Sequence, residues 1–295
     1  AAPIVFEGNA AADISGNAVL ESWLTDHRVS PGAALSAWLG EAVAIKDPTA
    51  AVFRKQSGAN LLMLGQQDRA AGTILLSVLV GLGAQLRRVD LRGLTPPGSP
   101  PEAAKSIHVV LGHSVDEEWE KELTLLGAHW PVQVTGSRDL PTLLNDLNAE
   151  FTRRLAGENG PPRFLVLFGL QRLRDLRRDE NDFGFGRPDQ PATPQKLFIN
   201  LIREGPALGL HTIVWCDNLA NLQRSVERSE LREFEMRVCF QMSATDSSSL
   251  LDSPIAAKLG PYRALFYAED QGKLEKFRPY GLPRADWLRR VLGKT

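Results

Sequence analysis

Three short runs of almost uninterrupted apolar residues dominate the pattern of this sequence. They cover residues 60–64, 163–168 and 210–216, and the first two are followed by a glycine. A strand with one face in water alternates apolar and polar residues, whereas a strand covered on both faces of a parallel sheet does not. The three runs therefore predict the central strands of a parallel sheet buried between two layers of helices.

Helical and strand-like segments alternate around these runs. Helices are expected over residues 18–23, 33–38, 72–86, 115–126, 140–155 and 195–205. Further strands are expected over residues 107–111, 132–134 and 236–242, with hairpins over residues 42–53 and 264–278. This alternation predicts an α/β fold with a mostly parallel central sheet covered on both faces, followed by antiparallel C-terminal strands.

The charge balance argues against a strongly basic nucleic-acid-binding protein. The chain has 295 residues, 43% of them hydrophobic and 23% charged, and its formal net charge is −1. A cluster of arginines occurs at residues 172–178, but Asp175, Asp179 and Glu180 are interleaved with it. We interpret this cluster as a solvated face of mixed charge, so DNA binding is possible but is not indicated by the charge.

The cysteines, the histidines and the hydropathy of the sequence indicate in which compartment the chain works and whether it binds metal or contacts a membrane. Cys216 and Cys239 are too few for a disulfide scaffold and lie in apolar runs, so we expect reduced core residues of a cytoplasmic protein. Apart from His108 and His113, which lie on either side of a strand end, the five histidines lack metal-ligand spacing, so no metal site is expected. No run of about 18 apolar residues stands out, which predicts no direct membrane contact by this segment. Because the chain begins without Met, we expect a piece of a longer protein, with any membrane tether elsewhere.

The segment after the first apolar run is where a nucleotide-binding loop would lie. A P-loop has the form G-x-x-x-x-G-K-[ST], in which glycines let backbone N–H groups surround phosphate and the lysine reaches the terminal phosphates. The corresponding residues here are Gly65, Gln66, Gln67, Asp68, Arg69, Ala70, Ala71, Gly72 and Thr73. Only the first glycine matches, because Ala70, Ala71 and Gly72 occupy the places of the second glycine, the lysine and the hydroxyl residue.

Several segments, in order, are similar to the motor domain of FtsK/SpoIIIE proteins. They are residues 60–82, 164–168, 203–214 and 237–252, followed by the Leu259-Gly260 turn and the strand at residues 264–267. The resemblance covers roughly residues 40 to 280. It implies a three-layer RecA-like P-loop NTPase fold over residues 41–295, with residues 1–40 as a leading segment packed on the core.

The departures from this family lie at its catalytic positions. Gly169 and Leu170 stand where the family places the acidic pair that serves magnesium and water. Possible sensor or subunit-boundary residues are Asp217, Asn218, Arg237, Asp246 and Arg263. Each of these also has a structural interpretation, as a turn-capping side chain or a surface arginine.

The resemblance and its departures together predict a non-catalytic FtsK/SpoIIIE-type module, a pseudo-ATPase within a longer multi-domain translocase. Its role would be assembly, regulation or docking of a substrate or partner, and ATP with Mg²⁺ is not expected to bind tightly. Expected partners are other ATPase modules and a protein substrate, and Phe183 and Phe185 form a possible partner-binding loop. The alternative is an ATP-binding motor domain of a DNA or protein translocase, with catalytic groups supplied by neighbouring subunits.

Overall fold

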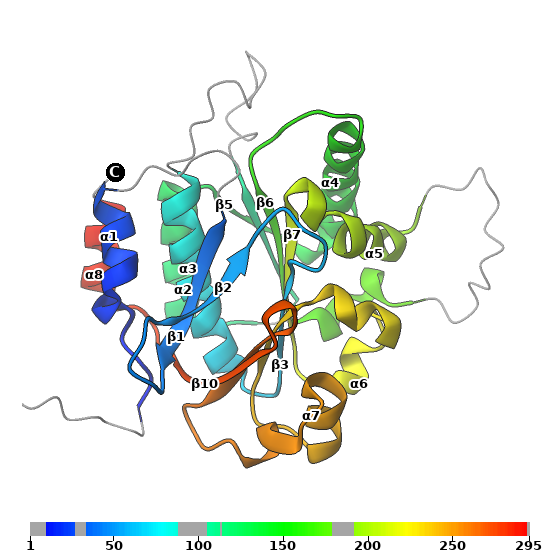
Figure 1. The fold of residues 1–295 in the computed structure, drawn as a ribbon. Coiled ribbons are helices and arrows are strands. Elements are labelled where there is room, and N and C mark those ends of the chain that lie inside the picture. Colours follow the sequence, from blue (N-terminus) through cyan, green and yellow to red (C-terminus); the bar gives the residue numbers. More distant parts are fainter. Residues whose placement is uncertain (1–9, 27–33, 88–104, 113, 179–191, 294–295) are drawn as a thin grey trace, which may run out of the picture.

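A ten-stranded mixed sheet runs through the whole molecule (Figure 1). The computed structural model describes residues 10–26, 34–87, 105–112, 114–178 and 192–293. In sheet order the strands are β2 (Thr49–Phe53), β1 (Leu35–Ala42), β10 (Lys273–Pro279), β9 (Ala264–Ala268), β8 (Met236–Cys239), β3 (Leu61–Leu64), β7 (Leu210–Cys216), β6 (Arg163–Phe168), β4 (Ile107–Leu111) and β5 (Val132–Thr135).

The sheet has a parallel part and an antiparallel part. Strands β8, β3, β7, β6, β4 and β5 are parallel to their neighbours. Strand β9 joins β8 in antiparallel register, and β10, β1 and β2 continue in the same way. The predicted fold class, a mostly parallel sheet with antiparallel C-terminal strands, is confirmed.

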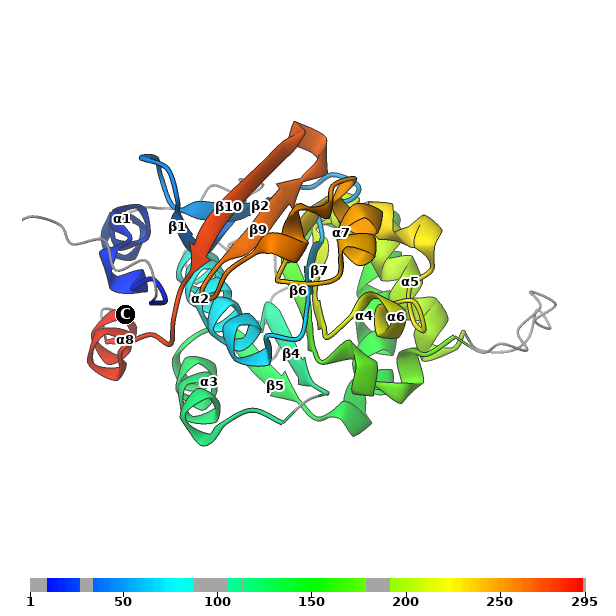
Figure 2. The same ribbon diagram turned by 90° about the horizontal axis from the view of Figure 1, so that it is seen from below.

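Helices cover both faces of the sheet, which makes three layers (Figures 1 and 2). One face carries α1 (Ala18–Asp26), α2 (Asp68–Leu86), α3 (Glu117–His129) and α8 (Ala285–Leu292). The other carries α4 (Leu140–Leu155), α5 (Pro194–Glu204), α6 (Leu219–Leu222) and α7 (Ala244–Leu251). Each face of the sheet has its own hydrophobic core, the first on the side of α2 and the second on the side of α5. Strand β3 is uniformly apolar because Leu61 and Met63 pack in the first core, and Leu62 and Leu64 pack in the second.

Helix α2 is the central helix of the first core. Every residue from Ala71 to Leu86 is buried, and an added Cβ at Gly81 would lie 2.9 Å from the ring of Trp38 on β1. Among the described helices, α2 is the one long and apolar enough to cross a bilayer by length and composition. The sequence-based statement that no such run stands out was therefore wrong, and the structure uses this run for contact with the sheet.

Several sequence-based boundaries differ from the structure. The helix expected at residues 33–38 is wrong, because this segment forms β1, which pairs with both β2 and β10. Consequently the first strand of the hairpin begins at Leu35 rather than at residue 42. Helix α2 begins at Asp68, four residues earlier than expected, and β8 ends at Cys239 rather than at residue 242.

The two cysteines lie on either side of β3. Cys216 on β7 and Cys239 on β8 are both in register with Leu64, and both are free and buried. Burial raises the pKa of each thiol to about 12. The thiols therefore act as apolar core groups at neutral pH.

His211, at the amino end of β7, is a buried ring that the fold holds neutral. It is 3% exposed, its Nδ1 lies 2.8 Å from the Ala59 carbonyl oxygen, and its ring stacks on Phe164 with centroids 5.2 Å apart. Burial lowers the pKa of His211 to about 4 from an ordinary value of 6.5. The neutral form is therefore the one that fits the folded chain.

The fold predicts a pH-dependent stability. Because the folded pKa of His211 lies below the unfolded one, its contribution is complete above pH 6.5 and is lost as the pH falls towards about 4. In His211→Gln, the slope of the unfolding free energy against pH should decrease by up to about 1.4 kcal/mol per pH unit in this interval. Urea denaturation at a series of pH values measures the slope. His129→Gln, an exposed control on α3, should leave it unchanged; equal slopes for wild type and His211→Gln would contradict the assignment.

Candidate functional site

The connection between β3 and α2 is only three residues long, namely Gly65, Gln66 and Gln67. Gly65 has φ = 135°, a conformation that L side chains rarely adopt, and its N–H donates to the Cys216 carbonyl at 3.2 Å. A Cβ added to Gly65 would lie 2.7 Å from the Cβ of Phe240. Glycine is therefore required here by close packing against Phe240, the residue that follows β8, and by the sharp turn into α2.

Helix α2 starts where a P-loop would still be a loop. In a P-loop, the phosphate-binding residues lie between the strand and the helix. Here Asp68 is the first helical residue, and Ala70 and Ala71, at the places of the second glycine and the lysine, belong to the first helical turn. The Thr73 hydroxyl donates back to the Ala70 carbonyl at 3.1 Å. The chain thus has a helical turn in place of a wrapped loop.

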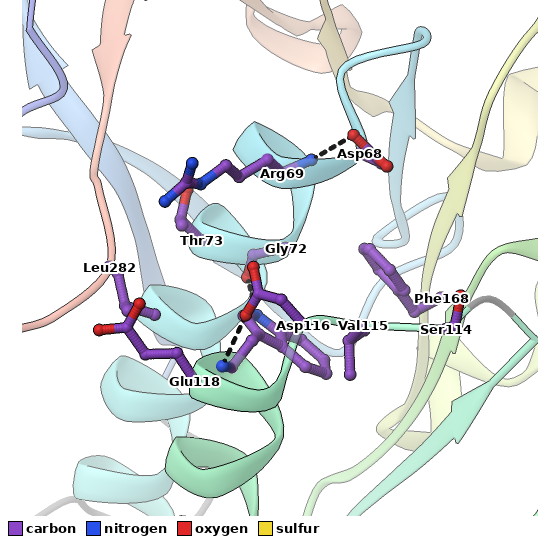
Figure 3. Close-up of a pocket in the computed structure, with 11 residues that line it drawn as sticks. Asp68, Arg69, Gly72, Thr73, Ser114, Val115, Asp116, Glu118, Phe168 and Leu282 are labelled. Carbon is purple, nitrogen blue, oxygen red and sulfur yellow. Dashed lines mark hydrogen bonds between the residues drawn. The ribbon is translucent and has the colours of Figure 1, made fainter.

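Asp68 brings a carboxylate to the start of this helix. Its Oδ1 accepts a hydrogen bond from the Arg69 backbone N–H at 2.7 Å (Figure 3). A carboxylate in the first turn interacts favourably with the helix dipole. It also places negative charge where a P-loop receives phosphate.

Three aromatic rings are stacked beneath the start of α2. Phe168, at the end of β6, stacks on Trp215 of β7 with centroids 4.5 Å apart and on Trp119 of α3 at 5.5 Å. The Trp215 indole N–H donates to the Gly65 carbonyl at 3.2 Å, and that of Trp119 to the Gly72 carbonyl at 2.7 Å. The stack therefore fixes both the connection and the second turn of the helix.

A pocket of about 320 Å³ opens beside this stack, between the starts of α2 and α3 (Figure 3). Its lining is Asp68, Arg69, Gly72, Thr73, Ser114, Val115, Asp116, Glu118, Trp119, Phe168 and Leu282. Its volume is within the range of small-molecule sites. The carboxylates of Asp68, Asp116 and Glu118 outnumber the single guanidinium of Arg69, so the net negative charge of the lining repels phosphate.

Gly169 and Leu170, at the positions of the acidic pair, have structural roles. Gly169 has φ = 88°, and its N–H donates to the Trp215 carbonyl at 3.1 Å. Leu170 is fully buried and packs in the second core. The end of β6 therefore presents neither carboxylate nor hydroxyl to the pocket.

Three of the expected sensor residues are used in local turns. Both carboxylate oxygens of Asp217 accept from the Asn221 amide, at 2.9 and 3.1 Å. Asn218 caps α6 by accepting from the Asn221 backbone N–H at 2.8 Å. Asp246 lies in the first turn of α7, where its own N–H donates to the Ser243 hydroxyl at 3.0 Å. None of the three is part of the pocket lining.

The two arginine candidates differ in environment. Arg237 on β8 is 8% exposed and donates to the carbonyls of Phe234, Leu250 and Leu231, besides an ion pair with Glu269. It therefore ties β8 to α7 from inside the fold. Arg263 is near the surface and donates to the carbonyl of Tyr262, a non-glycine residue with φ = 54°.

The other expected sites need only brief mention. Phe183 and Phe185 lie outside the described residues. Within the described ranges, no group of three or more His, Cys, Asp or Glu side chains is placed to hold a metal ion. Sequence reasoning missed the aromatic stack because no motif links Trp119 to the other two rings, Phe168 at the end of β6 and Trp215 one residue before the end of β7.

The sheet order and the strand–turn–helix at β3 give a fold that matches the structures of RecA-like P-loop ATPases. The chain is similar to the cytoplasmic domain of the type VII secretion ATPase EccC of Thermomonospora curvata, with a TM-score of 0.56 and 16% identity, covering 92% of this chain and 32% of that one. The cytoplasmic domain of EssC gives 0.55 and 16%, covering 84% and 43%.

A third similar structure is the pCW3 conjugation coupling protein TcpA with ATPγS, at a TM-score of 0.55 and 16% identity, covering 92% of this chain and 72% of that one. No family model matches the chain, and no curated protein matches its sequence. The chain thus spans about a third of the EccC chain and less than half of the EssC chain.

The environments of the two arginines predict different costs of substitution. Arg237→Lys replaces a fork that serves three buried carbonyls with a single ammonium, so the free energy of unfolding should fall by about 2–4 kcal/mol. Arg263→Lys, the matched control, should change it by less than about 0.5 kcal/mol. Chemical denaturation measures both. Similar values for the two variants would contradict the structural role of Arg237.

Proposed function

We propose that this chain is a non-catalytic module of the FtsK/SpoIIIE type that acts in assembly, regulation or docking rather than in ATP hydrolysis. The observation that carries the proposal is the three-residue connection that leads directly into α2 at Asp68. A loop of this length leaves no room for the run of glycine-flanked N–H groups that surrounds phosphate.

Electrostatics support the same proposal. Phosphoryl transfer depends on cations and metal-held carboxylates placed around the transferred group. Here Ala71 stands at the lysine position, Gly169 and Leu170 stand at the acidic pair, and Asp68, Asp116 and Glu118 surround the neighbouring pocket. Loss of a single group is open to compensation, whereas simultaneous loss of the lysine, the acidic pair and the wrapped loop removes every source of stabilisation.

The setting that we propose is a longer chain. The chain spans about a third of EccC, so a single module within a multi-domain translocase is the arrangement that fits this ratio. Its partners would then be other ATPase modules and a protein substrate. Because the EccC and EssC structures are cytoplasmic domains, we propose the same location, with any membrane tether elsewhere in the longer chain.

Nucleotide titration tests the absence of catalysis. With a fluorescent ATP analogue, we expect no magnesium-dependent binding tighter than about 10 μM, which corresponds to about −7 kcal/mol, and no phosphate release. TcpA, whose structure contains ATPγS, is the positive control measured in parallel. Magnesium-dependent binding with turnover by the chain itself would overturn the proposal.

A second experiment separates the length of the loop from its residues. Ala70→Gly, Ala71→Lys and Gly72→Thr together restore the P-loop residues, but they would lie in the first turns of α2. A Cβ at residue 72 would also lie 3.2 Å from the Trp119 indole nitrogen. We therefore expect the triple variant to bind Mg-ATP no better than wild type in the same titration. Ala70→Gly alone controls for helix destabilisation of about 1 kcal/mol. Tight binding by the folded triple variant would show that the loop re-forms.

A further inference from the structure

The connection between α4 and β6 contains the one Asn-Gly pair of the sequence, Asn159-Gly160. Helix α4 ends at Leu155, and β6 begins at Arg163. Between them Gly157, with φ = 101°, turns the chain out of the helix. The Asn-Gly pair therefore lies in an irregular segment that belongs to neither element.

This segment is held on both sides of the pair but not at the pair itself. Before it, the Glu158 N–H donates to a carbonyl in the last turn of α4 at 3.1 Å. After it, the Pro161 carbonyl accepts from Nη2 of Arg154 at 2.6 Å. Asn159 is exposed, and neither its side chain nor the Gly160 N–H makes a hydrogen bond within the described residues. The Asn159 amide and the Gly160 nitrogen are therefore free to approach each other.

The packing of Arg154 explains why the residue after Asn159 is a glycine. A Cβ added to Gly160 would lie 2.6 Å from Nη2, 3.0 Å from Cζ and 3.1 Å from Nε of Arg154. Arg154 is buried and also donates to the Leu208 carbonyl at 2.8 Å, so its guanidinium is fixed in place. Any other residue at position 160 would have to displace this guanidinium. The absence of a side chain there leaves the Gly160 nitrogen open to a neighbouring group.

The same guanidinium favours the reaction that an Asn-Gly pair can undergo. The backbone nitrogen of Gly160 becomes a nucleophile when it loses its proton, and a nearby cation stabilises the anion that forms. Arg154 and Arg163 both pair with the single carboxylate of Glu150. The group of charges beside Gly160 therefore remains net positive.

A further cation lies next to Arg154. A Cβ added to Gly209 would lie 3.0 Å from Cε of Lys55 and 3.4 Å from Nη1 of Arg154, so the two side chains converge above this glycine. Lys55 has no ion-pair partner within the described residues, and burial and the charge of Arg154 lower its pKa. A negative charge that appears in the segment beside Arg154 would therefore meet cations that are not fully neutralised.

We propose that Asn159 is a site of spontaneous deamidation in the folded chain. The Gly160 nitrogen gives up its proton to water and attacks Cγ of Asn159. The bond between Cγ and Nδ2 breaks, and the amide leaves as ammonia after it takes a proton from water. Water then opens the five-membered imide at either of its two carbonyls. One opening gives aspartate, and the other gives isoaspartate, in which the backbone passes through the side-chain carbon.

The two products differ in their effect on the fold. Aspartate adds one exposed negative charge beside the cations around Arg154, so we expect it to leave stability almost unchanged. Isoaspartate adds one carbon to the backbone between Glu158 and Pro161, whose hydrogen bonds fix the segment on both sides. We therefore expect isoaspartate, and not aspartate, to lower the midpoint of chemical denaturation.

Peptide mapping by mass spectrometry, after incubation of the purified chain at neutral pH, tests the site. Deamidation at Asn159 should be at least about tenfold faster than at Asn148, an internal control in α4 that precedes an alanine. Asn159→Gln should abolish modification of this segment, because glutamine would have to close a six-membered ring. The rate in the folded chain should be no lower than in the chain unfolded in urea, since folding leaves the pair unconstrained and adds the charge of Arg154.

An Asn159 that stays intact in the folded chain, or that reacts no faster than Asn148, would overturn the proposal. Reaction in urea together with protection in the folded chain would overturn it as well. Asn159→Asp provides the aspartate product, and its denaturation midpoint should match that of fresh wild type. Aged wild type that contains isoaspartate should unfold at a lower urea concentration, whereas aged Asn159→Gln should not. Equal midpoints for aged wild type and Asn159→Asp would contradict the effect assigned to the added backbone carbon.

Discussion

The position at which α2 begins is fixed from several directions, and the carboxyl edge of the sheet is arranged around it. Gly65 is pressed against Phe240, and its carbonyl is held by the Trp215 indole. The next turns are held by Trp119 at the Gly72 carbonyl. From Ala71 onwards the helix is buried, so it cannot slide along its axis without opening the first core. A longer phosphate-wrapping loop would require all of these contacts to move together.

This packing has an electrostatic consequence. An active P-loop ATPase concentrates positive charge and metal at the carboxyl edge, between the start of its helix and the neighbouring strand ends. Here aromatic rings fill the strand ends, and the exposed charge is divided by the sheet, with carboxylates around α3 and arginines beyond β6 and β7. The carboxylates that line the pocket between α2 and α3 therefore oppose the capture of a small anion at this edge.

Much of the fold could be predicted from sequence because its central strands are buried on both faces. The runs at β3, β6 and β7 contain too little polar character to be anything but interior strands or helices, and their length excludes helices. The prediction was wrong at β1, because a short run such as Leu35–Ala42 fits a helix as well as a strand. Its pairing with Phe53 on β2 and Phe277 on β10 identifies it as a strand. The start of α2 was predicted four residues too late for another reason. The P-loop pattern indicated a loop, whereas the contacts of Trp119 and Trp215 hold the segment as a helix. The contact between Arg178 and Arg224 could not be predicted, because these residues are neighbours only after folding.

Polar side chains are buried and hydrogen-bonded at the amino edge of the parallel sheet, whereas at the carboxyl edge many of them are exposed. At the amino edge, Asn60 donates to the carbonyls of Ile202 and Glu233 and accepts from the Thr212 N–H, so its polar atoms are used inside the fold. Arg154 likewise serves the carbonyls of Leu208 and Pro161 while it is 5% exposed. Buried groups satisfied in this way stabilise a single packing and have little left to offer a partner. At the carboxyl edge the exposed carboxylates and guanidinium groups lie in water, where they contribute little to stability. The exposed charges at the carboxyl edge are therefore not required by the fold itself.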